Sequence, residues 1–374
     1  MTGPPDVLII GGGVIGLTTA YYIAKEGVTV LVLDQGDLGR QASWAGAGII
    51  PPGNATRART SLDWLRACGS EMFPTLSHEL REQTAVDNGY VICGGLEIDD
   101  PAEPHPILAW LEEGIAFEEW DAGRVRERLP HVGPAVPKSY FLPRMAQVRN
   151  PRHVKALIAG CQRLGVHLRP HCEVRGLVRA GALITGIETD AGRLSAGQYL
   201  VAAGAWSDRL LKDAGCKTGV HPVRGQIALL QTETPLRPIL LVGKRYIVPR
   251  TDGRVLVGST EEDAGFDARP TAEAIADLLH MATRLVPDLA TAAIELCWAG
   301  LRPGTPDGLP YLGAMPGFRN LFVATGHFRA GIQQSPATGS LMAQLLVGKE
   351  PPIPLDAFRP DRPPQARTPA AFRS

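Results

Sequence analysis

The stretch Asp6–Asp34, DVLIIGGGVIGLTTAYYIAKEGVTVLVLD, decides the fold of this 374-residue chain. An apolar run over residues 6–10 is typical of a buried parallel strand, and Val14–Lys25 then has the apolar spacing of a helix. A second apolar run, Val28–Leu33, ends at an aspartate. The order of strand, glycine-rich turn, helix, strand and acid predicts a dinucleotide-binding βαβ unit.

The turn of this unit carries the pattern G-x-G-x-x-G at Gly11, Gly13 and Gly16. We expect Gly11 to permit the tight turn, Gly13 to let the backbone approach a pyrophosphate, and Gly16 to let the helix pack on the strand. The N–H groups at the helix N-terminus would bind the phosphates. Asp34 would accept hydrogen bonds from the ribose hydroxyls. The glycine pattern is weak alone, but its place between strand and helix makes it specific.

The composition of the chain excludes several classes of protein. Its net charge is zero, so we expect neither nucleic acid nor an anionic membrane surface as a partner. The six cysteines have no C-x-x-C spacing and predict free thiols in a reducing compartment. No apolar run reaches the roughly 18–20 residues of a membrane span, and residues 1–5 lack the basic start of a signal peptide. The sequence predicts a cytoplasmic protein without a membrane anchor or a metal site.

Strand and glycine signals of the cofactor-binding kind recur at both ends and in the middle of the chain, which predicts two interleaved domains. The expected fold class is α/β, with a Rossmann-like domain and an α+β substrate domain built on a large, mostly antiparallel sheet. The Rossmann-like domain would comprise residues 1–85, 146–218 and 299–350, the substrate domain 86–145 and 219–298, and a proline-rich C-terminal tail 351–374.

Two segments in the middle of the chain have local signals of their own. Val154–Leu164 is amphipathic, and we expect Asn150 to be the N-cap of this helix. Val166–Ile187 alternates like a small antiparallel meander, with turns expected at Gly176 and Gly181.

Three features favour FAD over a nicotinamide dinucleotide. Gly39–Ile50, GRQASWAGAGII, is a loop of small residues that would let backbone lie against a flat ring. Residues 204–206 form a second close-approach turn after a buried strand. Gly326–Gln334 stands between a strand and the last helix, whose N-terminus could point at a flavin and stabilise negative charge there. A nicotinamide-dependent dehydrogenase would leave these loops unexplained.

Further motifs follow in a fixed order along nearly the whole chain. They are IIGGGVIG, ASWAGAG, RYIVPR at Arg245–Arg250, WAGLRPGTPDGLPYLG at Trp298–Gly313, GHFRAGI at Gly326–Ile332, PATG at Pro336–Gly339 and FRPDR at Phe358–Arg362. With these motifs the chain resembles the glycine oxidases of the D-amino-acid oxidase and sarcosine oxidase superfamily of flavoproteins. The pair WAGLRPGTPDG and GHFR is the specific part of the resemblance.

The resemblance implies non-covalent FAD. Some members of the superfamily attach flavin through a cysteine or a histidine at positions where this chain has Gly300 and Ala45. The expected FAD-binding residues are Gly11, Gly13, Val14, Ile15, Gly16, Asp34, Gln35, Ala42, Ser43, Ala47, Gly48, Ile49, Val174, Gly204, Trp206, His327, Phe328, Arg329, Ala330, Gly331, Ile332 and Gln333.

The resemblance also implies substrate-binding residues. Arg302 would bind the substrate carboxylate with two parallel hydrogen bonds, or else belong to a structural ion pair. Tyr246 would hold the carboxylate or close the pocket, unless it is a core aromatic residue, and Arg329 would hold substrate or form a loop ion pair. Glu261 stands where a glycine oxidase has an apolar methionine in the pocket. Its carboxylate would repel a second acidic group and could attract the substrate amine, or it would turn outward.

The reaction implied is oxidative deamination of glycine, with sarcosine and small D-amino acids as lesser substrates. Hydride transfer to flavin N5 needs a neutral amine and correct aim, so we expect no catalytic general base. Imine or glyoxylate, ammonia and hydrogen peroxide would result, and the imine would serve thiamine thiazole synthesis. The family suggests a homo-oligomer, either dimer or tetramer. Two alternatives stay open: an amino-acid dehydrogenase with a non-oxygen acceptor, and the flavin subunit of a heteromeric amine oxidase or dehydrogenase.

Overall fold

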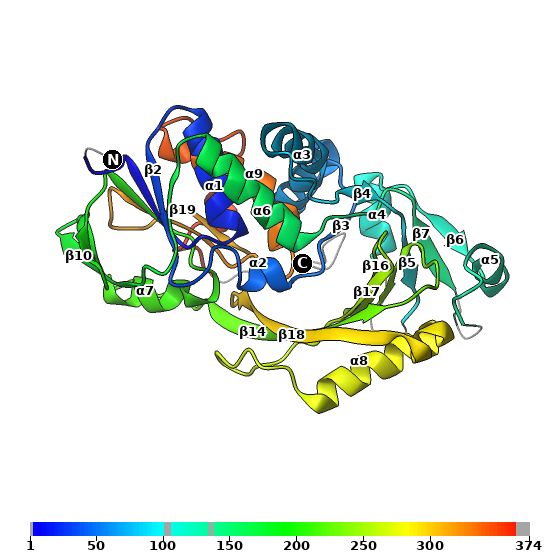
Figure 1. Ribbon diagram of the computed structural model, residues 1–374. Helices are drawn as coiled ribbons and strands as arrows, with labels where there is room; N and C mark the ends of the chain where they lie inside the picture. The colour runs from blue at the N-terminus through cyan, green and yellow to red at the C-terminus, as the bar shows by residue number, and fades with distance from the viewer. Residues whose placement is uncertain (1–2, 101–105, 134–135, 137, 364–374) are drawn as a thin grey trace.

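The molecule is built on two large sheets. In Figure 1 the first lies at the left, beneath helices α1 and α9, and the second lies at the lower right. The computed structural model describes residues 3–100, 106–133, 136 and 138–363. The predicted fold class, a Rossmann-like α/β part with an α+β part on a mostly antiparallel sheet, is confirmed.

The first sheet has six strands and contains the predicted βαβ unit. Its strands, in spatial order, are β19 Tyr311–Ala314, β20 Leu321–Thr325, β13 Gln198–Val201, β1 Val7–Ile10, β2 Val30–Leu33 and β9 His167–Arg169. All neighbours pair in parallel except β19 with β20. The central strands are buried on both faces, which explains their continuous apolar sequence.

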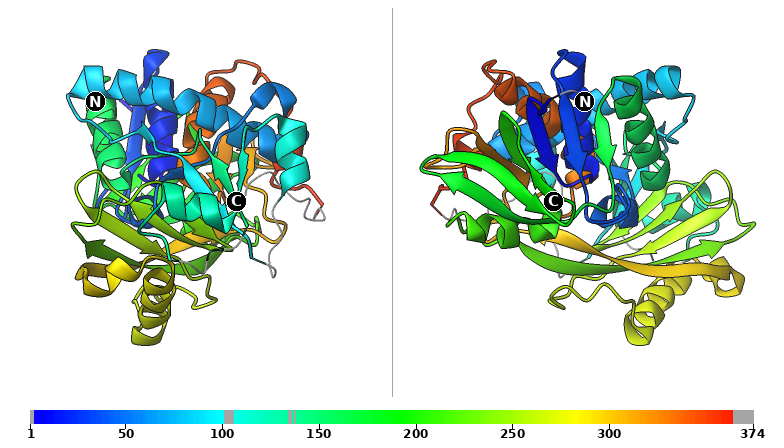
Figure 2. Two further views of the ribbon diagram at one scale, coloured as in Figure 1. Left: turned by 90° about the vertical axis from the view of Figure 1, so that its right-hand side faces the viewer. Right: turned by 60° about the vertical axis from the view of Figure 1, so that its left-hand side comes forward.

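Helices cover one face of the six-stranded sheet and a small sheet covers the other (Figure 2). The helices are α1 Val14–Lys25, α3 Ser61–Thr84, α6 Asn150–Arg163 and α9 Gly331–Leu346. On the opposite face lie α7 Ser207–Asp213 and the antiparallel strands β10 Val174–Ala180, β11 Leu183–Thr189 and β12 Gly192–Leu194. The sheet is therefore the middle of three layers.

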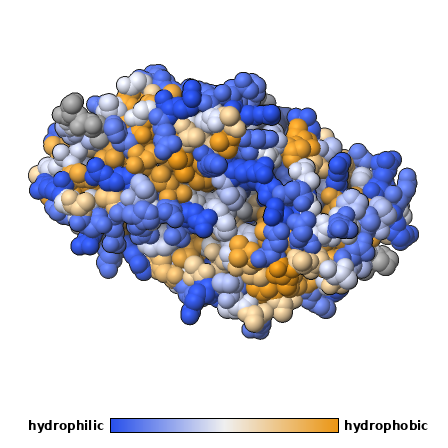
Figure 3. Space-filling model, in the orientation of Figure 1, coloured by the Kyte–Doolittle hydropathy of each residue, from blue (hydrophilic) through white to orange (hydrophobic). Residues whose placement is uncertain are grey.

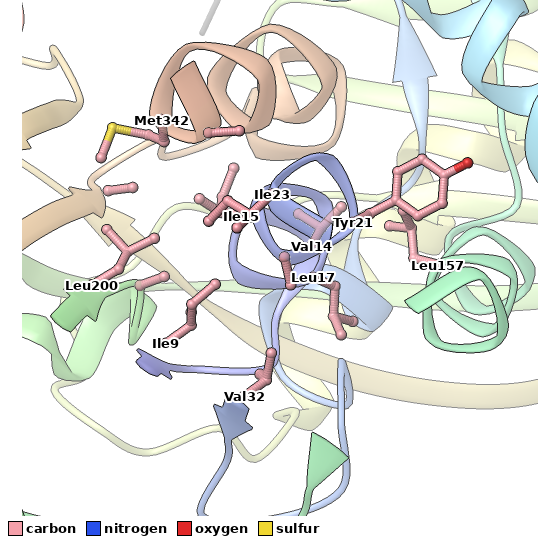
Figure 4. Close-up of a cluster of buried hydrophobic side chains, with 14 of the residues drawn as sticks. Ile9, Val14, Ile15, Leu17, Tyr21, Ile23, Val32, Leu157, Leu200 and Met342 are labelled. Carbon is pink, nitrogen blue, oxygen red and sulfur yellow. The ribbon is translucent and has the colours of Figure 1, made fainter. Parts of the chain in front are cut away.

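Helix α1 is the centre of the larger core. Figure 4 shows Leu17 and Tyr21 of α1 among side chains of the strands and of α6 and α9. Leu17, Ile23 and Tyr21 have no solvent exposure. Because burial of one such aliphatic side chain contributes about 1.5–3 kcal/mol, this packing fixes the position of the α1 N-terminus.

The glycine-rich turn between β1 and α1 leaves no space for side chains. Gly11 has φ +115°, and a Cβ added there would lie 2.3 Å from the carbonyl oxygen of Ala202. A Cβ at Gly16 would lie 1.9 Å from the carbonyl oxygen of Gly11. These approaches account for both glycines through packing alone.

The second sheet has eight strands. In spatial order they are β18 Ala293–Gly304, β14 His221–Gln231, β17 Arg254–Gly258, β16 Arg245–Pro249, β15 Ile239–Val242, β5 Gly95–Ile98, β7 Ser139–Leu142 and β6 Glu118–Trp120. Only β15 and β5 pair in parallel within the described part of this sheet. The predominantly antiparallel arrangement agrees with the prediction from the sequence.

Side chains alternate between the two faces of the eight-stranded sheet. Ile247 packs in the outer core with α8 Ala272–Leu285 and α5 Ala122–Arg128. Tyr246, one residue earlier, packs in the inner core with α4 Ile107–Glu113. The period of two places Tyr246 on the face that looks toward the six-stranded sheet.

A three-stranded sheet and a short helix connect the two halves. The sheet consists of β3 Ile49–Ile50, β8 Ala146–Gln147 and β4 Val91–Ile92. Helix α2 Ala42–Ala45 precedes β3 and contacts β18. The loop of small residues predicted to face a flat ring therefore lies between the sheets.

The structure differs from the sequence prediction at four places. Strand β18 runs continuously across the expected domain boundary at 298/299. Gly176 lies within β10 at a shift of register, not at a turn, and β9 belongs to the six-stranded sheet. Arg149, not Asn150, is the N-cap of α6, because the buried Asn150 side chain donates from Nδ2 to the Ser43 carbonyl, 2.9 Å away.

The C-terminal segment is attached to the body as far as the structure describes it. The expected tail 351–374 is described to residue 363, and residues 364–374 lie outside the described part. Phe358 is fully buried. Arg362 forms a buried, two-point ion pair with Asp307, with N–O distances of 2.8 and 2.9 Å. Up to this point the segment packs on the core.

The face of the molecule in Figure 3 has apolar residues gathered in its upper left part and near its lower edge over β18 and α8. Ile294 and Leu296 of β18 are 56% and 47% exposed. Strand β18 stands at the edge of the eight-stranded sheet, so one side of its backbone has no neighbouring strand within the described chain.

Candidate active site

One cavity of about 710 Å³ extends from the β1–α1 turn to the inner face of the eight-stranded sheet. Its lining includes every residue expected to bind FAD except Gly16, and also Tyr246, Arg302 and Arg329. Gly16 lies below the Gly11 turn, and Glu261 lies outside the lining. Residues of three distant parts of the sequence therefore meet around one space of the size typical for ligand pockets.

At the dinucleotide end, side chains already order the loops around the α1 N-terminus. The Asp34 carboxylate accepts from the backbone N–H groups of Gly12 and Gly36 at 2.8 and 2.9 Å. Burial raises the pKa of Asp34, and these two N–H groups partly offset the rise. The Ser43 hydroxyl accepts from the Val14 N–H at 2.8 Å, which ties the loop of small residues to α1. Asp34 lines the cavity, where its remaining lone pairs can accept from a ligand.

Three side chains to which the sequence analysis gave no role at this loop hold it from behind. Besides Asn150, Arg250 donates from Nη2 to the Ala47 carbonyl at 2.6 Å, and the Trp298 indole donates to the Ala45 carbonyl at 2.9 Å. Burial, with help from the charge of Arg149, lowers the pKa of Arg250 to about 10. A charged residue at the end of the apolar run RYIVPR was the available signal for Arg250.

The side chain of His327 shows whether the cavity wall fits a polar cofactor. Its ring is almost fully buried, Nε2 lies 3.0 Å from the Thr338 hydroxyl, and Nδ1 has no hydrogen-bond partner within the described residues. Burial lowers the pKa of His327 to about 3, so the ring is neutral. A buried nitrogen without a partner on the cavity wall fits a bound polar cofactor. With the glycine turn and the α1 N-terminus, the residues present fit FAD.

At the substrate end, Arg302 projects from β18 and is held on two sides. It donates from Nη1 to the Thr260 carbonyl at 3.0 Å and from Nη2 to the Ser259 hydroxyl at 2.7 Å. Its guanidinium lies against Gly225 of β14, where an added Cβ would stand 2.2 Å from the terminal nitrogens. Each terminal nitrogen carries a second hydrogen, so Arg302 keeps donors for a ligand.

Charge and burial act together on Arg302. Burial lowers the pKa of Arg302, and the positive charge of Arg329 lowers it further, while Tyr246 acts in the opposite direction. The pKa of a guanidinium stays far above neutrality, so Arg302 remains a cation although it is incompletely hydrated. A desolvated cation on a cavity wall favours an anionic ligand.

The ring of Tyr246 occupies space that a glycine on the next strand leaves free. Tyr246 pairs with Gly258 of β17, and a Cβ there would lie 2.7 Å from the Tyr246 ring. Tyr246 is 7% exposed and lines the cavity. It is thus both a member of the inner core and a wall of the site.

Arg329 and Glu261 bind each other. Arg329 donates from Nη1 to Glu261 Oε1 at 2.9 Å, and Lys244 lies 2.7 Å from Glu261 Oε2. Both carboxylate oxygens are engaged by cations, and Glu261 lies outside the cavity lining. Neither expected orientation of Glu261, toward a substrate amine or outward into solvent, describes this arrangement.

Gly300 and Ala45, the two positions at which the resemblance places covalent flavin attachment in other members, lie against each other. A Cβ added at Gly300 would stand 2.6 Å from the Cβ of Ala45. Neither residue carries a nucleophile.

The described residues contain neither a metal cluster nor a membrane-spanning helix. No group of three or more His, Cys, Asp or Glu side chains in this part of the chain is arranged to hold a metal ion. None of its helices has both the length and the apolar character needed to cross a bilayer.

Comparison with known proteins agrees with this geometry. Residues 6–345 match the family model of FAD dependent oxidoreductases. The chain is 39% identical to the glycine oxidase of Pseudomonas putida over 95% of its own length and 98% of that protein. It is 33% identical to the bifunctional protein ThiO/ThiG of Trichormus variabilis, over 91% of this chain and 52% of that one.

A solved structure gives the same result. The crystal structure of glycine oxidase from Geobacillus kaustophilus superposes with a TM-score of 0.89, at 33% identity, over 96% of this chain and 99% of that one. Since full-length identity, family model and fold agree, the chain belongs to the glycine oxidase family of FAD-dependent oxidoreductases.

Proposed function

We propose that this protein oxidises glycine, and more slowly sarcosine and small D-amino acids, with non-covalent FAD and molecular oxygen. The single observation that carries the proposal is the position of Arg302. It is a partly desolvated cation, held by Ser259 and Thr260, on the wall of the same cavity that the dinucleotide turn opens into. An α-amino acid bound there by its carboxylate has its Cα within the cavity.

We propose a division of labour between the two sheets. The residues around the six-stranded sheet, with the expected FAD-binding set, would hold FAD, and the inner face of the eight-stranded sheet would hold the amino acid. The last FAD-binding segment would begin after Gly304, where β18 ends, since β18 belongs to the eight-stranded sheet up to that residue. Helix α2 and β3, between the sheets, would separate the two ligands from solvent.

In this proposal Arg302 binds the substrate carboxylate through its two spare N–H donors, which fixes the Cα and its hydrogen in one direction. The Tyr246 hydroxyl supports the same carboxylate. FAD, when bound, supplies the acceptor for the hydride that leaves Cα and passes the electrons to oxygen. No step needs a strong base from the protein, because the amine reacts in its neutral form. His327 stays neutral at the wall and donates or accepts one hydrogen bond there.

The test is an anaerobic mixture of purified, yellow protein with glycine, followed by air. Bleaching of the visible absorbance with glycine, and recovery with one hydrogen peroxide per glyoxylate formed, would support the proposal. Bleaching without peroxide, but with reduction of an added dye, would favour the dehydrogenase alternative. A failure to bleach with glycine, sarcosine and D-alanine would contradict the proposed substrate class.

We further propose a homo-oligomer in the cytoplasm whose imine product serves thiamine thiazole synthesis. The similarity to a bifunctional ThiO/ThiG protein supports the last point. All six cysteines are free thiols, which fits a reducing compartment. Sedimentation would give the oligomeric state, and thiamine auxotrophy of a deletion strain would test the role.

A further inference from the structure

Three charged side chains meet at the substrate end of the cavity from separate parts of the sequence. Lys244 stands in the turn between β15 and β16, Glu261 follows β17, and Arg329 precedes α9. The Lys244 ammonium lies 2.7 Å from Glu261 Oε2, and the Arg329 Nη1 lies 2.9 Å from Glu261 Oε1. One carboxylate therefore binds two cations, one with each oxygen.

The two cations line the cavity, whereas the carboxylate stands behind them. The Lys244 side chain is 53% exposed, against 19% for Glu261 and 15% for Arg329. Arg329 also donates from Nη2 to the Lys244 carbonyl at 2.7 Å, which fixes the turn to the Arg329 loop. Glu261 thus neutralises one of two positive charges that a substrate would otherwise meet.

Glu261 is ionised at neutral pH. Burial by itself would raise its pKa, but the hydrogen bonds and charges of Lys244 and Arg329 outweigh burial and hold the pKa below its usual value. A second acidic group on a substrate that reached Lys244 or Arg329 would approach a full negative charge. It would have to compete for the same N–H donors.

We propose that Glu261 is a specificity-determining residue that restricts the pocket to amino acids with one carboxylate. It does so by keeping both Lys244 and Arg329 in ion pairs with its own carboxylate. This inference rests on the proposed function, in which Arg302 binds the first carboxylate. With Glu261 neutral, the pocket would present two unpaired cations and accept a second acidic group, as in iminodiacetate.

The first test compares Glu261→Gln with the wild-type holoenzyme on glycine and iminodiacetate. The ratio of kcat/KM for iminodiacetate to that for glycine is expected to rise about tenfold or more, since juxtaposed like charges cost several kcal/mol. Glu262→Gln is the matched control, because Glu262 is the next residue but pairs with Arg224 instead. The control is expected to keep the wild-type ratio. Glu261→Asp, which keeps the charge, is expected to restore most of the wild-type selectivity.

A second readout needs no turnover. Acetate and malonate do not react, and their dissociation constants follow from the change in visible absorbance of the bound flavin. The ratio of affinities, malonate over acetate, should rise about tenfold in Glu261→Gln and stay unchanged in Glu262→Gln. Lys244→Gln, which removes a cation and keeps the carboxylate, should instead lower malonate affinity several-fold.

The outcomes separate this inference from the proposed function. A wild-type protein that binds acetate but does not oxidise glycine would contradict the function, while the malonate ratio would still decide the role of Glu261. An unchanged ratio in a folded Glu261→Gln, or an equal rise in Glu262→Gln, would overturn the inference. If Glu261→Gln does not fold, an unchanged malonate affinity in Lys244→Gln would overturn it.

Discussion

The dinucleotide turn and the substrate end of the cavity are built in different ways. The turn uses backbone and glycine, within about 30 residues of sequence, and an added Cβ at Gly11 or Gly16 would collide with a carbonyl oxygen. The substrate end uses side chains from β16, β18 and the loop after β17, held by charges and hydrogen bonds. The first construction tolerates no added atom. The second tolerates exchange of side chains and can change what it binds.

The largest effect is expected at the turn. Gly16→Val places side-chain atoms where the Gly11 carbonyl lies, and we expect no folded, FAD-containing protein. Visible absorbance of the purified protein and thermal unfolding would measure this. Gly176→Ala is the control, because an added Cβ there meets nothing within 4 Å. A yellow Gly16→Val protein with normal thermal stability would contradict the statement that the turn tolerates no added atoms.

Arg362 is a structural arginine, and its substitution can be compared with that of Arg302, which is expected to bind substrate. Its donors are taken by Asp307 and by the carbonyls of Leu309 and Pro310, and its side chain is 2% exposed. Removal of one partner of a buried ion pair costs about 3–5 kcal/mol, so Arg362→Met should lower the free energy of unfolding by that amount. We expect no change in the KM for glycine. A large rise in KM with unaltered stability would contradict the structural role.

Arg302→Lys should show the opposite pattern. A lysine cannot reproduce two parallel hydrogen bonds to a carboxylate, and the loss of roughly 3 kcal/mol corresponds to a rise in KM of about a hundredfold. The variant should stay yellow and melt near the wild-type temperature. Steady-state kinetics and FAD content measure both. If Arg302→Lys instead loses FAD or unfolds, the structural ion-pair alternative is correct.

Helix α6, which holds the loop of small residues through Asn150, should make the stability of the protein depend on pH. His153 of α6 is fully buried, with Nδ1 3.1 Å from the Asn88 side-chain amide, and burial lowers the pKa of His153 from 6.5 to about 4. The unfolded chain therefore binds a proton that the folded protein rejects between these pH values. The stability contributed by neutral His153 is complete above pH 6.5 and is lost as the pH falls to about 4, up to roughly 3 kcal/mol.

Urea unfolding at several pH values measures this loss. His153→Gln should have a flatter profile between pH 6.5 and 4. His280→Gln, at an exposed histidine of α8, should keep the wild-type slope. Parallel profiles for all three proteins would show that the burial of His153 does not control acid stability.

Much of the first region could be predicted from the sequence, because its determinants are local. Strand, turn and helix of residues 6–34 each follow from neighbours a few positions apart. Asn150 shows the limit: an Asn-Pro pair at a helix start predicts an N-cap, yet the side chain reaches Ser43, 107 residues earlier. Tertiary contacts of this separation leave no periodic signal in the chain.

The second region could be predicted only through resemblance. Tyr246, Arg302 and Arg329 were identified by their motifs, and the structure brings all three to one cavity. The orientation of Glu261 could not be predicted, because it depends on Lys244, 17 positions before it, and Arg329, 68 positions after it. An ion pair between loops becomes visible only when both loops are placed.

The smallest expected effect concerns the support of the loop. Asn150→Ala removes the hydrogen bond to the Ser43 carbonyl and leaves that group buried, a cost of about 1–3 kcal/mol. We expect FAD to bind about tenfold more weakly, as measured by titration of the apoprotein, with an unchanged KM for glycine at saturating FAD. A changed KM with normal FAD affinity would show that the loop serves the substrate end instead.

The contact between Gly300 and Ala45 has a consequence for how this protein could evolve. A cysteine at 300 would enter the volume of the Ala45 methyl group, and a histidine at 45 would enter the space that Gly300 leaves open. The effect of either substitution thus depends on the residue at the other position, and the two sites are epistatic. The route to a covalent flavin link through Gly300→Cys is therefore not one mutation away from this sequence, since the accompanying shift of α2 must arise first or at the same time.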